Sequence, residues 1–128
     1  MRKKYEHLII ENKREKLSTV AFHNDVSCID RYFAEGFPFH LAIHKVSKAE
    51  NVEKYTELHT HDVDELNIII CEDGEMEYLI QLGDEEYHLK SNTSIWIPKR
   101  LPHSANVISG SGYYIAMRLN RIPDEFQV

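Results

Sequence analysis

The sequence predicts an all-β domain built as an antiparallel sandwich or barrel, and three observations support this prediction. From residue 37 onward, short runs of alternating apolar and polar residues are separated by turn-forming residues, with almost no helical periodicity. The chain of 128 residues is long enough for one hydrophobic core. No stretch rich in Pro, Gly or Ser divides it, which indicates a single domain.

The expected strands follow one another at close spacing. They span residues 39–46, 66–71, 75–82, 87–89, 94–98, 103–108 and 113–119. Turns are expected at Glu72-Asp73-Gly74, at Gly83-Asp84-Glu85-Glu86 and at Ser109-Gly110-Ser111-Gly112, which separates the last two strands. We expect residues 1–36 to form an N-terminal strand or arm that packs on a barrel of residues 37–119, and residues 120–128 to form a C-terminal tail.

Composition excludes several classes of partner. The net charge is -6, which disfavours binding to duplex nucleic acid. Residues 1–16 carry six basic and three acidic residues, but no aromatic interleaving accompanies this charge, so a solvated edge is favoured over a nucleic-acid arm. There is no signal peptide and no apolar run long enough to span a membrane, so a membrane partner is not expected. Cys28 and Cys71 show no motif spacing and are expected as buried or half-buried thiols of a cytoplasmic protein.

Four residues carry most of the functional information. His59, His61 and Glu65 share the parity of a strand with Asn67, so these side chains should project to the same side. His103 opens a later expected strand. If both sets face the barrel interior, three imidazoles and one carboxylate meet there. Such a mixed nitrogen and oxygen set suits one divalent transition metal, either Fe, Mn, Ni, Cu, Co or Zn.

The same residues resemble the two motifs of the cupin superfamily. His59-x-His61-xxx-Glu65 matches the first motif, with Gly74 near the position of its trailing glycine, and Pro98-x-x-x-Pro102-His103 matches the second. The resemblance covers residues 37–119. It implies a small single-domain metal-binding cupin, which is a β-barrel of jelly-roll (double-stranded β-helix) type. It also implies a divalent metal held by His59, His61, Glu65 and His103.

Several neighbours of these positions are candidate catalytic residues. Asn67 faces the same side as Glu65 and could orient a substrate or make a structural hydrogen bond. His44, with His40 on the same strand face, is a candidate acid or base. On the last strand, either Tyr113 and Met117 or Tyr114, Ala116 and Arg118 face inward, and the pattern does not choose between them. Lys99 and Arg100 precede His103 and could draw an anionic substrate, although a solvated turn is favoured.

Two functions from different classes follow. The first is a metal-dependent enzyme acting on a small polar, anionic molecule, because a 3-His/1-Glu set leaves two octahedral positions open for a substrate. Resemblance to cupins implies dioxygenase, isomerase, lyase or decarboxylase chemistry, and dioxygenase is slightly favoured. The alternative is a non-catalytic sensory cupin that binds a small ligand. Sensor barrels are commonly fused to a DNA-reading helical domain, and the 128 residues contain no pattern for one. Outward-facing Leu66, Ile68 and Ile70 predict a homodimer.

Overall fold

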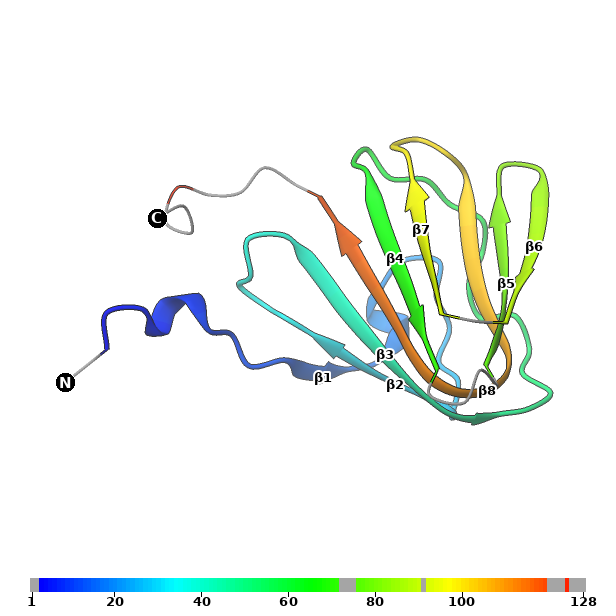
Figure 1. Ribbon diagram of the computed structural model, residues 1–128, viewed down its shortest axis with the longest axis horizontal. Coiled ribbons are helices and arrows are strands. Elements are labelled where there is room, and N and C mark those ends of the chain that lie inside the picture. The colour runs from blue at the N-terminus through cyan, green and yellow to red at the C-terminus, as the bar shows by residue number, and fades with distance from the viewer. Residues whose placement is uncertain (1–2, 72–75, 91, 120–123, 125–128) are drawn as a thin grey trace.

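The computed structural model is almost entirely β-structure and describes residues 3–71, 76–90, 92–119 and 124 (Figure 1). The strands are β1 (Lys13–Glu15), β2 (Ile29–Phe33), β3 (His40–Ala49), β4 (Glu65–Ile70), β5 (Glu77–Leu82), β6 (Glu85–Leu89), β7 (Thr93–Ile97) and β8 (His103–Arg118). Two 3-10 helices, η1 (Glu6–Leu8) and η2 (Leu17–Thr19), lie before β2. The predicted all-β barrel class is confirmed. No helix in the described part of the chain is long and apolar enough to cross a lipid bilayer.

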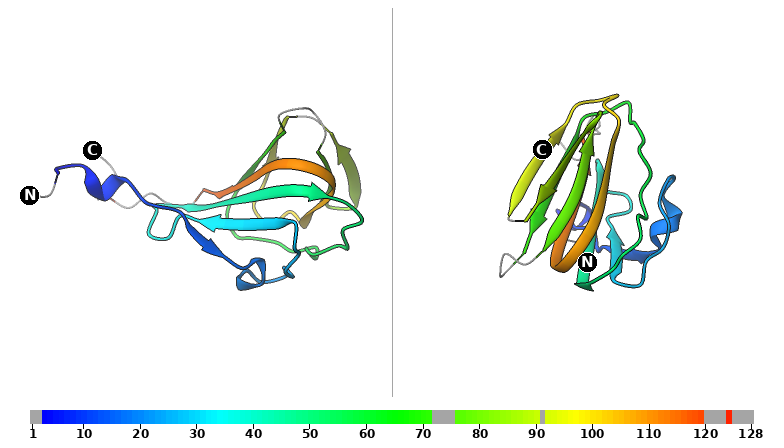
Figure 2. Two further views of the ribbon diagram at one scale, coloured as in Figure 1. Left: turned by 90° about the horizontal axis from the view of Figure 1, so that it is seen from below. Right: turned by 90° about the vertical axis from the view of Figure 1, so that its right-hand side faces the viewer.

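The strands form two layers that share β8 (Figure 2). One layer has the order β1-β2-β3-β8-β4-β7, and the other pairs β6 with β5 and β5 with β8. All strand pairs among the described residues run antiparallel. Because β8 belongs to both layers, a side chain near its start and one near its end can face the same interior.

The long strand β8 corrects one expectation, that Ser109-Gly110-Ser111-Gly112 forms a turn between two strands. The chain bends there but does not reverse. Gly110 has φ +94°, a left-handed conformation that costs glycine little, and both Gly110 and Gly112 remain paired with β3. The first half of β8 pairs with β5 and the second half with β3 and β4. The hairpin turn expected at residues 72–74 lies outside the described residues.

The core lies between the two layers and follows the predicted alternation. Met76, Tyr78 and Ile80 are each at most 2% exposed, and Ile69 on β4 is fully buried beneath them. Cys71 is buried in this core and Cys28 is half-buried, both as free thiols. These residues fill the interior at one end, and the polar side chains of the candidate site occupy the other.

Residues 1–36 contribute two strands to the main sheet. β2 pairs along its whole length with β3, and β1 pairs with β2 at the edge. This pairing places Arg31 of β2 opposite His44 of β3. The segment that carries η1 extends away from the barrel in Figure 1 and in the left view of Figure 2.

Candidate metal centre

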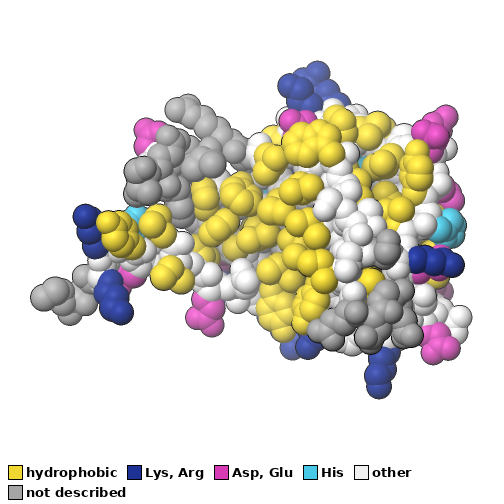
Figure 3. Space-filling model, in the orientation of Figure 1, with side chains coloured by type: hydrophobic (Ala, Val, Ile, Leu, Met, Phe, Trp, Pro, Cys, Tyr) yellow, Lys and Arg dark blue, Asp and Glu magenta, His cyan; other side chains and the backbone are white. Residues whose placement is uncertain are grey.

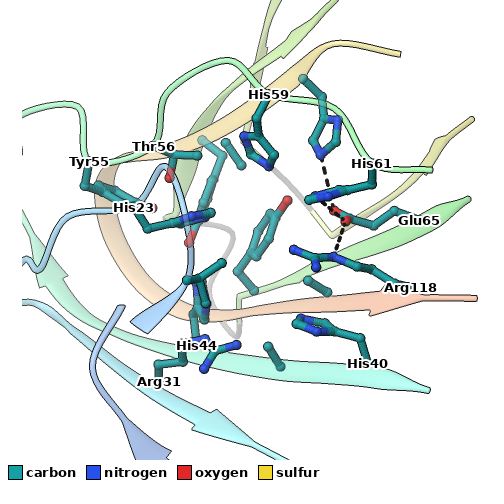
Figure 4. Close-up of a pocket in the computed structure, with 17 residues that line it drawn as sticks. His23, Arg31, His40, His44, Tyr55, Thr56, His59, His61, Glu65 and Arg118 are labelled. Carbon is teal, nitrogen blue, oxygen red and sulfur yellow. Dashed lines mark hydrogen bonds and ion pairs between the residues drawn. The ribbon is translucent and has the colours of Figure 1, made fainter. Parts of the chain in front are cut away.

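Three imidazoles meet at one end of the barrel (Figure 4). One potential ligand nitrogen from each of His59, His61 and His103 lies within 4.8 Å of the other two. Glu65 faces them, with Oε1 3.5 Å from Nε2 of His61 and Oε2 3.7 Å from Nε2 of His103. The structure therefore brings together all four residues of the two sequence motifs.

Backbone pairing holds the two motifs side by side. The amide nitrogens of His59 and His103 each donate to the carbonyl oxygen of the other residue, at 3.0 and 2.9 Å. The amide of Arg100 also donates to the carbonyl of His61, at 2.7 Å. His59 lies in an isolated bridge and Glu65 opens β4, so the two are not on one continuous strand. The ligands converge because two separate segments are joined by these hydrogen bonds.

Hydrogen bonds to the other ring nitrogen orient two of the imidazoles. Nδ1 of His59 lies 2.7 Å from the carbonyl oxygen of Glu57, and Nδ1 of His103 lies 2.9 Å from that of Leu101. A carbonyl oxygen can only accept, so each Nδ1 carries a hydrogen and each ring leaves its Nε2 for the site. Burial lowers the pKa of His59, and burial together with the charge of Arg118 lowers that of His61 to about 3. Neutral imidazole is the form that binds metal.

Two of these nitrogens lack a partner within the described part of the chain. Nε2 of His61 and Nε2 of His103 are buried without a hydrogen bond. Buried polar atoms are normally satisfied, because an unpaired one costs about 1–3 kcal/mol. Both atoms face the carboxylate of Glu65 across more than a hydrogen-bond distance. A divalent cation between them would satisfy both nitrogens and the carboxylate, so the donor set fits a metal.

A hydrogen-bond chain orients Glu65 from behind. The side-chain amide of Asn67 donates to Oε2 of Glu65 at 2.9 Å, and the hydroxyl of Tyr114 donates to Oδ1 of Asn67. Arg118 contacts the other oxygen, with Nε 3.4 Å from Oε1. Asn67 is only 1% exposed and does not line the pocket. The sequence left two roles open for Asn67, orienting a substrate or making a structural hydrogen bond. The structure shows the hydrogen bond, which goes to the predicted metal ligand Glu65.

The second half of β8 presents one of the two sets left open by the sequence pattern. Tyr114, Ala116 and Arg118 line the pocket, whereas Tyr113 and Met117 lie on the other face. His40 and His44 of β3 also line it. Burial, with nearby Arg118 and Arg31, lowers the pKa of His40 to about 4, and burial with Arg31 lowers that of His44 to about 3. Both are therefore neutral at pH 7 and able to accept a hydrogen bond, whereas burial makes their protonation unfavourable.

Three pocket residues come from the N-terminal segment and were missed by sequence reasoning. His23, Val20 and Arg31 line the pocket, and the His23 ring meets that of His59 edge-on at 5.5 Å. Phe22 stacks on the other side of His59 at 5.6 Å, with a left-handed backbone at φ +67°. These residues lie outside both motifs, so no spacing connects them to the site. Residues 29–33 around Arg31 also lack a clear alternation of apolar and polar residues that could have placed it.

The two cations of the second motif do not enter the pocket. Lys99 and Arg100 are exposed, and neither lines the cavity. The Arg100 side chain lies 3.9 Å from the carboxylate of Asp62, in a left-handed turn at φ +69°. The positive charge inside the pocket comes from Arg31 and Arg118.

Comparison with solved structures shows the same fold in other proteins. KdgF from Halomonas sp. superposes with a TM-score of 0.58 at 14% identity, over 84% of this chain and 93% of that one. The Fe(II) form of HppE gives a TM-score of 0.61 at 16% identity, over 89% of this chain and 62% of that one. An RmlC-like cupin from Shewanella frigidimarina NCIMB 400 gives 0.55 at 13% identity, over 84% and 95%. A search of the curated proteins finds no sequence match.

Residues 47–120 match the sequence family described as the AraC-like ligand binding domain. The match covers more than half of the chain and includes both histidine motifs. Together with the barrel topology and the cupin neighbours, it confirms the resemblance seen in the sequence. The protein belongs to the AraC-like ligand-binding domains, a family within the cupin superfamily.

Proposed function

We propose that the protein binds one divalent transition metal through His59, His61, Glu65 and His103. The observation that carries the proposal is the convergence of buried, unpaired imidazole nitrogens on one carboxylate. The fold shared with Fe(II) HppE supports it. A metal held by these four side chains would keep open positions for a chelating molecule and would supply Lewis-acid activation there, or dioxygen chemistry if it were iron.

The activity that best fits this site is enzymatic action on a small polar, anionic molecule. Two arginines line the pocket, and the neutral His44 beside them can accept a hydrogen bond from a bound substrate. Three neutral imidazoles and one carboxylate suit Fe(II), which favours a dioxygenase slightly over an isomerase, lyase or decarboxylase. Two free thiols in a chain of this size agree with a reducing, cytoplasmic setting.

The family match favours a second candidate, a sensory barrel that binds its ligand without turnover. The two candidates make different predictions for metal-loaded protein given candidate small acids. An enzyme converts the acid, with oxygen consumption if it is a dioxygenase. A sensor returns the acid unchanged after binding it. Parallel measurement of bound and recovered ligand, together with an oxygen electrode, therefore separates them. Recovery of every bound acid unchanged would rule out the enzymatic reading.

Asn67 is proposed as a positioning residue for Glu65. An Asn67→Ala protein is expected to bind metal roughly 10- to 100-fold more weakly, because residues that orient a metal ligand typically contribute this much. Tyr114→Phe should show a smaller loss, since it removes only the donor to Asn67. Gln81→Ala serves as the matched control, because Gln81 is another side-chain amide whose hydrogen bond goes to the carbonyl of Gly83 and not to a proposed ligand. Competition with a chromophoric chelator measures the affinities, and an unchanged Asn67→Ala value would refute the role.

A homodimer is proposed from an apolar face on the outside of the main sheet. Cross-strand partners share a face, so the registers of β3, β8, β4 and β7 define it. Its members are Leu41, Ile43, Leu66, Ile68, Ile70, Trp96, Tyr113, Ile115 and Met117. Trp96 is 53% exposed and Ile70 is 42% exposed. Figure 3 shows hydrophobic side chains gathered over these strands, and a monomer rarely leaves so continuous a patch in water.

Light scattering should therefore give twice the 15.0 kDa mass of one chain. Ile68→Glu places a charge in the middle of this face and is expected to yield monomers, because an unpaired charge in an apolar contact is costly. Tyr87→Glu, at an exposed aromatic residue of β6 outside this face, should leave the dimer intact. A wild-type mass near that of one chain at all concentrations would contradict the proposal.

A further inference from the structure

One wall of the cavity carries two polar side chains that are not among the proposed metal ligands. His23 comes from the loop after η2, and Thr56 comes from the segment before the first histidine motif. Both line the cavity, and Figure 4 shows them next to each other on its left side, with His59 following to the right. The metal centre does not account for this pair.

Backbone pairing brings the two side chains together. His23 and Thr56 face each other in an isolated antiparallel bridge. The hydrogen bonds of the bridge join the flanking residues, from the amide of Asn24 to the carbonyl of Tyr55 at 2.7 Å and from the amide of Glu57 to the carbonyl of Phe22 at 3.0 Å. In an antiparallel pair of this kind the facing side chains lie closest, with Cβ atoms about 4.5–5.5 Å apart. His23 and Thr56 therefore offer their polar groups to the same part of the cavity.

His23 supplies a hydrogen-bond acceptor to this wall. Its Nδ1 lies 2.8 Å from the carbonyl oxygen of Ala21, which can only accept, so Nδ1 carries a hydrogen. Burial lowers the pKa of His23, and the ring is neutral at pH 7. The ring points into the cavity in Figure 4. Its Nε2, with a lone pair and no hydrogen, is therefore the atom left for a ligand.

Thr56 supplies a hydroxyl with no partner among the residues that the structure describes. The residue is 6% exposed, and its Oγ1 is buried without a hydrogen bond. Asn106 fixes its main chain, because its Oδ1 accepts from the amide of Thr56 at 3.0 Å and its Nδ2 donates to the carbonyl at 3.2 Å. Buried hydroxyls normally have a partner, so this one is expected to meet a ligand or a water molecule.

The pair adjoins the proposed metal centre. The ring of His23 meets that of His59 edge-on, with centroids 5.5 Å apart. The loop that carries His23 is closed at its base by Ser18, whose amide and hydroxyl both donate to the carboxylate of Asp25 at 2.9 Å. His23 is thus held beside a proposed ligand, within reach of atoms that a molecule bound at the metal would place in the cavity.

The hydrogen-bonding pattern of this wall selects one kind of chemical group. A carboxylate or carbonyl oxygen carries only lone pairs and would face the lone pair of His23 Nε2. An ammonium group could donate to both residues, but Arg31 and Arg118 line the same cavity and oppose a further positive charge. A hydroxyl group donates to Nε2 of His23 and accepts from the hydroxyl of Thr56, so it satisfies both residues.

The size of the cavity restricts the molecule that carries this hydroxyl. The cavity volume is about 50 Å³, and one water molecule needs roughly 10–15 Å³ of such space. We infer that His23 and Thr56 form a subsite for the hydroxyl group of a very small hydroxy acid, of two or three carbons, whose carboxylate binds the metal. The inference rests on the proposed function, because the metal holds the carboxylate.

The test compares glycolate with acetate, which differ only in the hydroxyl group. Each acid is titrated into Co(II)-loaded protein, and the change in the visible absorption of the metal reports binding. Chelation of the metal by the hydroxyl also favours glycolate, so the measured quantity is the part of the preference that a variant loses. Thr56→Val removes the hydroxyl but keeps the shape. Its preference for glycolate should fall roughly 3- to 10-fold, the effect of losing one hydrogen bond, with acetate affinity unchanged.

Further variants separate recognition from packing. Thr56→Ser keeps the hydroxyl and should keep the preference, whereas His23→Phe keeps a ring beside His59 and should lose as much as Thr56→Val. The matched controls are Thr19→Val and His88→Phe, at exposed positions that do not line the cavity, and both should bind like the wild type. Thr56→Val should melt no lower than the wild type, because it removes a buried hydroxyl that has no partner.

The Co(II) content of every sample is measured alongside binding. Wild-type protein without Co(II) would refute the proposed function, and this inference with it. If Co(II) is held but glycolate binds no more tightly than acetate, or folded Thr56→Val protein keeps the full preference, only this inference is overturned. Loss of Co(II) from folded His23→Phe protein would make His23 a metal ligand and would also overturn it. Should His23→Phe not fold, the comparison of Thr56→Val with Thr56→Ser decides.

Discussion

Replacing His103 by alanine is expected to lower metal affinity by at least about 100-fold, because loss of a direct ligand should exceed the 10- to 100-fold cost of losing a supporting residue. His103 is the residue that ties the second motif to the first. Its Nε2 faces Glu65, and its backbone pairs with that of His59. The wild-type protein, purified without an affinity tag, should carry about one divalent ion per chain by elemental analysis. The His103→Ala protein should carry almost none.

The control for this experiment is His88→Ala. His88 lies on β6, where its exposed ring pairs with Glu77 far from the three convergent imidazoles. This substitution should leave the metal content unchanged, which separates the site from adventitious binding to surface histidines. His59→Ala and His61→Ala should behave like His103→Ala. Equal metal content in His88→Ala and His103→Ala proteins would contradict the assignment of the ligands.

Replacing Gly112 by alanine is expected to destabilise the fold by about 2–4 kcal/mol, a large effect for the addition of one methyl group. Gly112 lies in β8, where this strand passes from one layer to the other. A Cβ at this position would lie 2.3 Å from the carbonyl oxygen of Ile70 and 3.1 Å from Cα of Cys71. Both atoms belong to the backbone at the end of β4, so relief requires the two strands to move apart.

Urea unfolding measures this effect as a shift in the transition midpoint. Ser109→Ala is the matched control, because it changes a half-buried residue of the same strand by removing a single atom. Its unfolding midpoint should stay within the small range typical of such substitutions, about 0.5 kcal/mol. If Gly112→Ala unfolds at the same urea concentration as the wild type, the close approach of β8 to β4 is wrong.

Much of the fold could be predicted because strand alternation reports which face is buried. Ile69 and Asn67 face the interior, and Leu66, Ile68 and Ile70 face outward, as their parity indicates. The continuity of β8 could not be predicted, since glycines such as Gly110 and Gly112 occur in turns and also at bends within strands. Only pairing with β3 on one side and β5 on the other decides between these, and pairing is a property of the folded chain.

The candidate site, like the fold, could be predicted from the sequence only in part. His59, His61, Glu65 and His103 were predicted because their types and spacings match two motifs, and they converge. Arg31 and His23 reach the same cavity through the pairing of β2 with β3 and through a bridge from His23 to Thr56. Such contacts join positions far apart in sequence. No local sequence pattern contains these contacts, so Arg31 and His23 could be assigned to the pocket only from the folded structure.

The most direct test of a metal site with open positions is nitric oxide binding by protein loaded anaerobically with Fe(II). Four protein ligands would complete a tetrahedral structural site, whereas an octahedral ion held by the same groups keeps two positions free. Electron paramagnetic resonance should therefore show a ferrous nitrosyl signal, which Asn67→Ala protein retains at saturating iron. Iron-loaded wild-type protein that gives no such signal would contradict an open site, and with it the proposed enzyme.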